Sequence, residues 1–150
     1  MPDRRGSNSV TKAGKRKYMA IKKSKATLKR NRIIAELDAA CRKRVVEDRD
    51  NNTCQKCGAF AGQWDSERGR FVKIQWSHIY TREYHCVRWD DDNSMAKCDR
   101  CHLWFTHHHT QGVRWFSEKF PCRWDKISHI VNSGVKVRPA DLLAELRDEE

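Results

Sequence analysis

Apolar residues recur every three or four positions between residues 27 and 47, and this spacing predicts an amphipathic helix. Residues 71–78 are rich in β-branched and aromatic side chains and alternate roughly between apolar and polar positions, which predicts a strand. A second short strand is expected at residues 95–97, and a helix is expected to begin near Cys101. The middle of the chain is therefore predicted to form two strands followed by a helix.

The last third of the chain is predicted to be helical. Apolar residues around Phe116 fit one helix that breaks at Pro121, and those around Ile127 fit a second helix that Gly134 closes. Residues 139–147 are expected to form a short terminal helix that begins with proline, because the missing N–H costs no hydrogen bond in the first turn. The pattern as a whole indicates an α+β protein.

Residues 1–26 differ from the rest of the chain because they are polar, rich in lysine and without periodicity. Such a segment cannot bury enough apolar surface to fold alone, and we expect it to be a flexible, disordered arm. The remainder is long enough for one compact domain, predicted at residues 27–135, followed by a C-terminal helix at residues 136–150. The sequence has no run of about 18 apolar residues and no signal-peptide core, so we expect a soluble, cytoplasmic protein with no membrane partner.

The charge of the chain is concentrated at its N-terminus. Residues 1–32 contain twelve lysines and arginines and one acid, whereas residues 33–150 contain nineteen basic and nineteen acidic residues, so the first segment carries the whole formal net charge of +11. A basic block of this kind is drawn to polyanions, and nucleic acid is the expected partner. A solubilising tail or a localisation signal is the alternative. The basic residues expected to contact DNA are Lys15, Arg16, Lys17, Lys22, Lys23, Lys29 and Arg30.

The chain has seven cysteines, an odd number that argues against a disulfide scaffold. Four of them form two C-x2-C pairs, Cys54 with Cys57 and Cys98 with Cys101. A two-residue spacer lets one tight turn present two sulfurs to zinc, which prefers four thiolate or imidazole ligands in a tetrahedron. We therefore predict a structural Zn²⁺ site, with unrelated buried or redox-active cysteines as the alternative. The remaining cysteines are expected to be ordinary thiols: Cys41, Cys86 and Cys122.

Four segments around these cysteines carry a resemblance to a known family. They are residues 44–58 (RVVEDRDNNTCQKCG), 76–82 (WSHIYTR), 88–93 (RWDDDN) and 98–107 (CDRCHLWFTH). Together they resemble the HNH, or ββα-metal, endonuclease superfamily, in particular phage-encoded recombination nucleases similar to NinG and Rap. The resemblance covers about residues 44–121 and implies a small ββα-metal core on a pair of zinc knuckles, flanked by helices.

The resemblance implies an enzyme that hydrolyses phosphodiester bonds of double-stranded or branched DNA, in recombination or DNA processing. It makes His78 the general base, whose unperturbed pKa of about 6.5 leaves the ring largely neutral at physiological pH. Asn93 is then the residue that holds His78 in its orientation, and His102 is a ligand of a catalytic Mg²⁺ or Mn²⁺ ion. Arg82, four residues past His78, is the expected phosphate contact.

Two positions depart from the pattern of the family. Ser77 replaces the aspartate or histidine that often precedes the catalytic histidine, and Thr106 stands where some members carry a second histidine. His107 cannot replace that ligand on a regular helix, because residues five apart, at about 100° per residue, point about 140° apart. His102 is therefore expected to be the main protein ligand, completed by water and substrate phosphate.

Two other functions fit part of this pattern. A zinc-finger protein that binds DNA without cleaving it would use the same cysteines and basic arm, but it would give His78 and Asn93 no special role. An RNA-binding zinc protein is the third hypothesis, because a lysine-rich segment cannot distinguish RNA from DNA. Trp64 and Trp89 flank the predicted site and are expected to pack in the core, with stacking on a base as the alternative.

Overall fold

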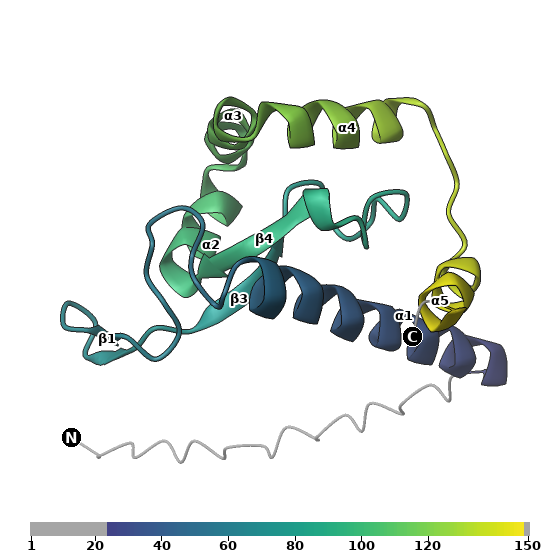
Figure 1. The fold of residues 1–150 in the computed structure, drawn as a ribbon, viewed down its shortest axis with the longest axis horizontal. Helices are drawn as coiled ribbons and strands as arrows, with labels where there is room; N and C mark the ends of the chain where they lie inside the picture. Colours follow the sequence, from purple (N-terminus) through teal and green to yellow (C-terminus); the bar gives the residue numbers. More distant parts are fainter. Residues whose placement is uncertain (1–23, 149–150) are drawn as a thin grey trace, which may run out of the picture.

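The computed structural model describes residues 24–148, which form five α-helices and two short antiparallel hairpins (Figure 1). The protein is therefore of the α+β class, as predicted. Among the helices of this part of the chain, none combines the length and the apolar character that a membrane span requires. Most of the predicted arm lies outside the described residues, together with five of its basic residues: Lys15, Arg16, Lys17, Lys22 and Lys23.

Helix α1 (Lys25–Arg42) begins at Ser24, whose hydroxyl accepts a hydrogen bond from the amide of Thr27 at 3.1 Å. The helix continues as a wider π-helical stretch, η1 (Lys43–Arg49), so the helix predicted at residues 27–47 is confirmed. Four of its apolar side chains are buried in the interior of the protein, namely Leu37, Cys41, Val45 and Val46, whereas Leu28 in the first turns is exposed.

The central hairpin pairs strand β3 (Ile74–His78) with strand β4 (Ser94–Cys98) in antiparallel register. A short 3-10 turn, η2 (Asp91–Asn93), leads into β4, and helix α2 (Asp99–His107) follows β4 directly. The predicted order of strand, strand and helix is therefore confirmed. This β3–β4–α2 unit carries the candidate functional residues.

A second, smaller hairpin joins strand β1 (Trp64–Asp65) to strand β2 (Arg70–Phe71). The strand predicted at residues 71–78 is therefore divided between two hairpins. Trp64 is 54% exposed, so the prediction that it packs in the core is wrong. The small hairpin extends away from the other elements (Figure 1), and the ring that Trp64 contacts is that of Phe71, with 5.2 Å between the two centroids.

Three helices complete the fold: α3 (His109–Lys119), α4 (Pro121–Asn132) and α5 (Pro139–Asp148). Proline occupies the first position of both α4 and α5, where its missing N–H leaves no helical hydrogen bond unmade. Gly134, which adopts a φ of 68°, follows the end of α4. The helices expected in the last third of the chain are therefore confirmed.

The central hairpin separates two apolar cores (Figure 1). On one side α1, η1 and α5 pack together, and on the other side α2, α3 and α4 do so. The first core includes Leu37, Val45, Trp76, Trp89 and Leu143, and the second includes Met95, Phe105, Phe116 and Ile127. Because successive side chains of a strand point to opposite faces, Ala96 of β4 enters the first core and Met95 of β4 enters the second, whereas Trp76 of β3 enters the first.

Candidate functional site

The four paired cysteines come together where β4 meets α2. Cys54 and Cys57 lie in the turn after η1, whereas Cys98 ends β4 and Cys101 lies in the first turn of α2. Gly58, with a φ of 76°, closes the first turn by donating its amide to the carbonyl of Cys54 at 2.9 Å. The four sulfur atoms all lie within 4.8 Å of one another.

The spacing of these sulfurs fits a tetrahedral metal ion. The Sγ atoms of Cys57 and Cys98 are 3.7 Å apart, and sulfurs about 2.3 Å from one zinc ion would be about 3.8 Å apart. A hydrogen bond from the Cys101 thiol, together with backbone amides, lowers the pKa of Cys54 to about 4, and the same contact raises the pKa of Cys101. One sulfur is thus favoured as a thiolate, the form that binds metal. The cluster is consistent with a structural Zn²⁺ site, as predicted.

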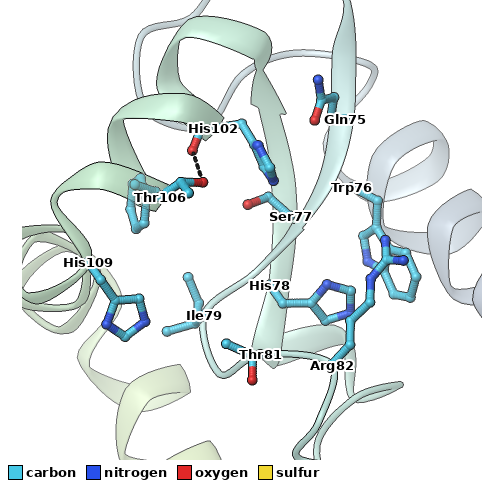
Figure 2. A pocket seen from close by; sticks show the side chains of 11 residues that line it. Gln75, Trp76, Ser77, His78, Ile79, Thr81, Arg82, His102, Thr106 and His109 are labelled. Carbon is cyan, nitrogen blue, oxygen red and sulfur yellow. Dashed lines mark hydrogen bonds between the residues drawn. The ribbon is translucent and has the colours of Figure 1, made fainter. Parts of the chain in front are cut away.

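A cleft of about 510 Å³ opens where β3 and the loop after it face α2 (Figure 2). Three histidines line it: His78 at the end of β3, His102 on α2, and His109 at the start of α3. Figure 2 shows the His102 ring beside Ser77 and the His78 ring beside Arg82. Two of the predicted catalytic residues, His78 and His102, therefore face one space.

His78 is oriented by the main chain. Its Nε2 lies 3.1 Å from the carbonyl oxygen of Arg88, and because a carbonyl can only accept, Nε2 carries the proton of the neutral ring. Nδ1 is then left as a hydrogen-bond acceptor. Burial, and after it the charge of Arg82, lowers the pKa of His78 to about 4. At physiological pH the ring is therefore neutral, which is the state that a general base requires.

Asn93 is fully buried and braces the loop that follows His78. Its Oδ1 accepts a hydrogen bond from the amide of Tyr80 at 2.8 Å, and its Nδ2 donates to the carbonyl of Tyr80 at 3.1 Å. Its own carbonyl accepts from the amide of Ile79 at 2.8 Å. Asn93 therefore acts on the two residues after His78, and it lies outside the lining of the cleft.

His102 is half-buried in the first turns of α2, one residue after Cys101. Burial, together with the charges of Lys97 and Arg82, lowers its pKa. Thr106, one turn further on, donates its hydroxyl to the carbonyl of His102 at 3.1 Å, so this side chain is engaged with its own helix. His102 is therefore the imidazole that α2 presents to the cleft.

His109 is the histidine of the cleft that the sequence did not reveal. His107 is exposed and does not line the cleft, whereas His109 does. The reason is a break at His108, which leaves the helical conformation with φ −125° and ψ 50°, so that α2 ends and α3 begins in a new direction. No proline or glycine marks this break, and the only signal in the sequence is the run of three histidines.

The remaining predicted DNA contacts within the described residues are exposed. Arg82 lines the cleft, and its guanidinium lies 5.4 Å from the centroid of the Trp76 ring. Lys29 and Arg30 lie on the first turns of α1 and do not line the cleft. Arg82 is therefore the basic side chain best placed to meet a phosphate group in the cleft.

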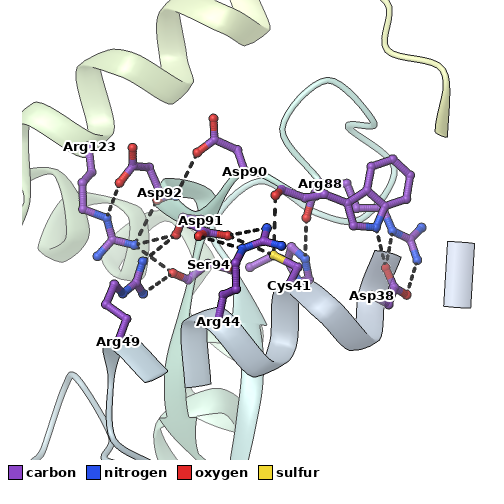
Figure 3. A network of polar contacts seen from close by, with 12 residues as sticks. Asp38, Cys41, Arg44, Arg49, Arg88, Asp90, Asp91, Asp92, Ser94 and Arg123 are labelled. Carbon is purple, nitrogen blue, oxygen red and sulfur yellow. Dashed lines mark hydrogen bonds and ion pairs between the residues drawn. The ribbon is translucent and has the colours of Figure 1, made fainter. Parts of the chain in front are cut away.

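A network of ion pairs holds the segment between the two strands of the hairpin (Figure 3). Asp91 pairs with Arg44 at 3.0 Å, and Asp92 pairs with Lys126 at 2.7 Å. These acidic side chains immediately precede Asn93 and connect η2 to elements on both sides of the hairpin. Both carboxylates are therefore already paired with cations, and these ion pairs tie the turn that precedes Asn93 to the elements around it.

A separate ion pair, between Asp38 and Arg88, holds the loop whose carbonyl faces His78. The carboxylate of Asp38 accepts from the guanidinium of Arg88 at 2.7 Å and from the indole of Trp89 at 2.8 Å. Burial works to raise the pKa of Asp38, but these hydrogen bonds hold it below its usual value. Helix α1, which carries Asp38, therefore determines the path of the chain at Arg88, whose carbonyl faces the ring of His78.

Comparisons of the chain with models of protein families, with curated proteins and with solved structures find no match. The HNH assignment therefore remains a resemblance, carried by the motifs quoted above. Within residues 24–148, the four cysteines are the only group of three or more histidine, cysteine or acidic side chains close enough to share a metal ion. A catalytic ion in the cleft would rely on His102, with water and substrate oxygens as its other ligands.

Proposed function

We propose that the protein is a metal-dependent endonuclease of the HNH type that hydrolyses DNA phosphodiester bonds in phage recombination or DNA processing. The observation that carries this proposal is the cleft of the β3–β4–α2 unit, where His78 and His102 face the same space. The neutral state of His78 supports it. The position of Asn93, which braces the loop after His78 through Tyr80, supports it further.

In this proposal the protein supplies a base, a phosphate contact and a metal ligand. His78 uses Nδ1 to accept a proton from the water that attacks phosphorus, because Nε2–H is held by the carbonyl of Arg88. Arg82 binds a non-bridging phosphate oxygen at the rim of the cleft. His102 would hold the Mg²⁺ or Mn²⁺ ion, which when bound adds positive charge beside the phosphate.

The cysteine cluster would hold a structural Zn²⁺ ion. Thiolates at tetrahedral spacing suit zinc better than the hard ions expected in the cleft. Cys98 ends β4, and Cys101 directly precedes His102, so the ion would fix the backbone that presents the catalytic ligand. Zinc would therefore stabilise the fold, while the chemistry takes place in the cleft.

The distribution of charge supports DNA as the substrate. Residues 1–32 account for the whole net charge of +11. The structure describes two of the DNA contacts predicted in this segment. These residues, Lys29 and Arg30, are exposed on α1. Contacts between such side chains and phosphates release counterions and give affinity that does not depend on base sequence. The basic segment would hold double-stranded or branched DNA while the cleft cleaves it.

One observation favours a second candidate, a zinc-finger protein that binds DNA or RNA without cleaving it. Ser77 is buried and has no charge, and Thr106 is bonded to its own helix. Neither side chain strengthens the ligand shell around His102. A binding protein stabilised by zinc would need no such shell.

A plasmid-nicking assay with Mg²⁺, Mn²⁺ or EDTA separates the two candidates. We expect cleavage with either ion and none with EDTA, and His78→Ala should lower kcat by about 10²–10⁴-fold with zinc content and DNA binding nearly unchanged. His129→Ala is the matched control, because His129 is exposed on α4 and does not line the cleft. Full activity of His78→Ala would exclude His78 as the base. A wild-type protein that binds DNA but never cleaves it would favour the second candidate.

A further inference from the structure

A smaller pocket of about 240 Å³ adjoins the cleft. Its lining comes from the loop after β3, from the first half of α3 and from the first turn of α4. Ile79 and His109, both labelled in Figure 2, line the cleft and the pocket alike. These two side chains therefore form the border between the pocket and the space that His78 and His102 face.

Aromatic and aliphatic side chains form most of the wall of this pocket. The rings of Tyr80 and Trp124 are stacked, with 5.6 Å between their centroids and 4° between their planes, and Ile79 and Val113 add aliphatic surface. A third ring, that of Tyr84, lies 5.3 Å from the ring of Tyr80 and is 45% exposed, so the aromatic group reaches the surface. Such a wall suits a flat ring, because aromatic side chains attract the face of another π-system.

The Tyr80 side of the pocket is held in place from two directions. Its backbone amide and carbonyl both bond to the side chain of the buried Asn93, at 2.8 and 3.1 Å. Its hydroxyl lies 3.3 Å from the hydroxyl of Ser128 on α4. The pocket is therefore formed in advance, as is usual for binding sites of small flat ligands.

The polar groups of the two spaces suit a ligand that is carried on an anionic chain. His109 and Thr110 are exposed at the start of α3, and each offers the pocket a side chain that can donate or accept a hydrogen bond. Among the described residues that line the cleft or the pocket, none is acidic, and Arg82 is basic. A nucleobase combines flat faces, a polar edge and an attached phosphate backbone, so it matches both the pocket and its border with the cleft.

The size of the pocket suits one nucleobase. A volume of 240 Å³ equals that of about eight water molecules, at about 30 Å³ each in the liquid, which is too little for a base pair. A base in a continuous duplex is stacked on both faces and paired at its edge. Only an unpaired or extruded base can therefore enter, and entry costs least for a base that is already unpaired.

We infer that this pocket binds one unpaired nucleobase of the DNA strand whose backbone lies in the cleft. This inference rests on the proposed function and narrows its substrate to DNA with an unpaired base beside the cleaved bond. The base stacks against the aromatic wall of Tyr80 and Trp124, and its polar edge meets His109 and Thr110. The pocket therefore gives the protein a preference for unpaired bases that phosphate contacts alone cannot give.

Two short DNA duplexes measure this preference. One carries a single unpaired base, and the other carries an abasic sugar at the same unpaired position, so that the two differ only in the base. Binding of the full chain to each is measured in EDTA, which prevents cleavage, and at one salt concentration. We expect the wild type to bind the duplex with the unpaired base on the order of tenfold more tightly, because stacking of one base gives an effect of this size.

Filling the pocket should remove the preference. Val113→Phe places a larger side chain in the pocket, and we expect the two duplexes then to bind almost equally. Val135→Phe is the matched control, because Val135 is 52% exposed and lines neither the pocket nor the cleft. This variant should keep the preference of the wild type.

The outcomes separate this inference from the proposed function. Equal binding of both duplexes by the wild type, or an unchanged preference in Val113→Phe, would overturn the base pocket and leave cleavage in the cleft standing. A preference that Val113→Phe removes, in a protein that never cleaves DNA with Mg²⁺ or Mn²⁺, would support the pocket and refute the nuclease. A wild type that binds neither duplex would refute both.

Photocrosslinking provides a second measurement if Val113→Phe does not fold. An unpaired iodouracil in the same duplex is irradiated in complex with the wild-type protein, and the modified residue is identified by mass spectrometry. A crosslink to Tyr80 or Trp124 would support the inference. Crosslinks that form only outside the lining of the pocket would overturn it.

Discussion

The cysteine cluster lies at one end of the β3–β4 hairpin, and His78 of the cleft lies at the other. Cys98 pairs with Ile74 at one end, and His78 pairs with Ser94 at the other. At the cluster, four sulfurs from two turns already lie within 4.8 Å of one another, and three of the four cysteines are buried. At the cleft, the three histidines come from three different elements and face an open space of about 510 Å³.

This difference shows what each end of the hairpin needs from outside the chain. The cluster offers four cysteine sulfurs, enough to fill a tetrahedral shell, as is typical of a structural zinc site. In the proposed function the cleft supplies a base and one metal ligand, and water and substrate phosphate complete the metal shell. The two ends should therefore respond differently to mutation: loss of a cluster residue should unfold the protein, whereas loss of a cleft residue should leave a folded but inactive one.

Cys98→Ser should have the largest effect. Structural zinc sites supply on the order of 10 kcal/mol or more of apparent binding free energy, and loss of one ligand should remove both zinc and cooperative folding. Metal analysis and thermal unfolding followed by circular dichroism would measure this. Cys122→Ser, which changes an exposed cysteine outside the cluster, should behave like the wild type. A folded Cys98→Ser protein of normal stability would contradict the structural role.

His102→Ala tests the opposite end of the comparison. We expect cleavage to fall by at least about 10²-fold, as for the loss of one strong charge-stabilising contact in the transition state, with the melting temperature nearly unchanged. His107→Ala should keep most of the activity, because His107 is exposed and does not line the cleft. Steady-state cleavage of plasmid DNA measures both variants. If His107 were essential and His102 dispensable, the assignment of the metal ligand would be wrong.

Gly112→Ala should perturb the core beside the cleft through Phe105. A Cβ atom at position 112 would lie 2.5 Å from Cδ1 of Phe105, a ring that also lines the cleft. We expect the free energy of unfolding to fall by about 1–3 kcal/mol, as in other overpacked cores. Urea denaturation would measure it, with the exposed Gln111→Ala as the control on the same helix. Unchanged stability would show that the ring can move at little cost.

The smallest effect concerns the pH dependence of cleavage. Burial and the charge of Arg82 lower the pKa of His78 to about 4. A lowered pKa keeps the base unprotonated as the pH falls, so the rate should stay nearly constant between pH 7.5 and about pH 6, where a histidine of ordinary pKa near 6.5 would lose activity. Initial rates of DNA cleavage measured across this pH range test whether the rate stays constant. A half-maximal rate near pH 6.5 would mean that His78 is solvated when DNA is bound.

The two ends also differ in how well the sequence predicts them. The cluster could be predicted because two residues between cysteines define one local turn, and the register of β3 and β4 then brings the pairs together. The place of His109 in the cleft could not be predicted, because it depends on a helix break that no proline or glycine marks.

The elements of the fold also differ in how well the sequence predicts them. The helices follow from periodicity, since each spans several repeats of its apolar pattern, and β3 follows from its rough alternation. The small hairpin of β1 and β2 pairs two residues on each side, which is too short for an alternating pattern to appear. The sequence predicts Trp64 in the core only because tryptophan is a large aromatic residue. Its exposed position results from its pairing with Phe71, which no local signal in the sequence indicates.

The carbonyl of Arg88 belongs to the main chain, and this has a consequence for how the protein tolerates genetic change. Every residue type carries the same carbonyl, so no substitution at position 88 can delete the acceptor of His78. A substitution can only move the acceptor by altering the path of the loop, and Asp38 controls that path from a helix fifty residues away in the sequence. Substitutions at positions 38 and 88 should therefore affect His78 in the same way, because both act by shifting the carbonyl of residue 88.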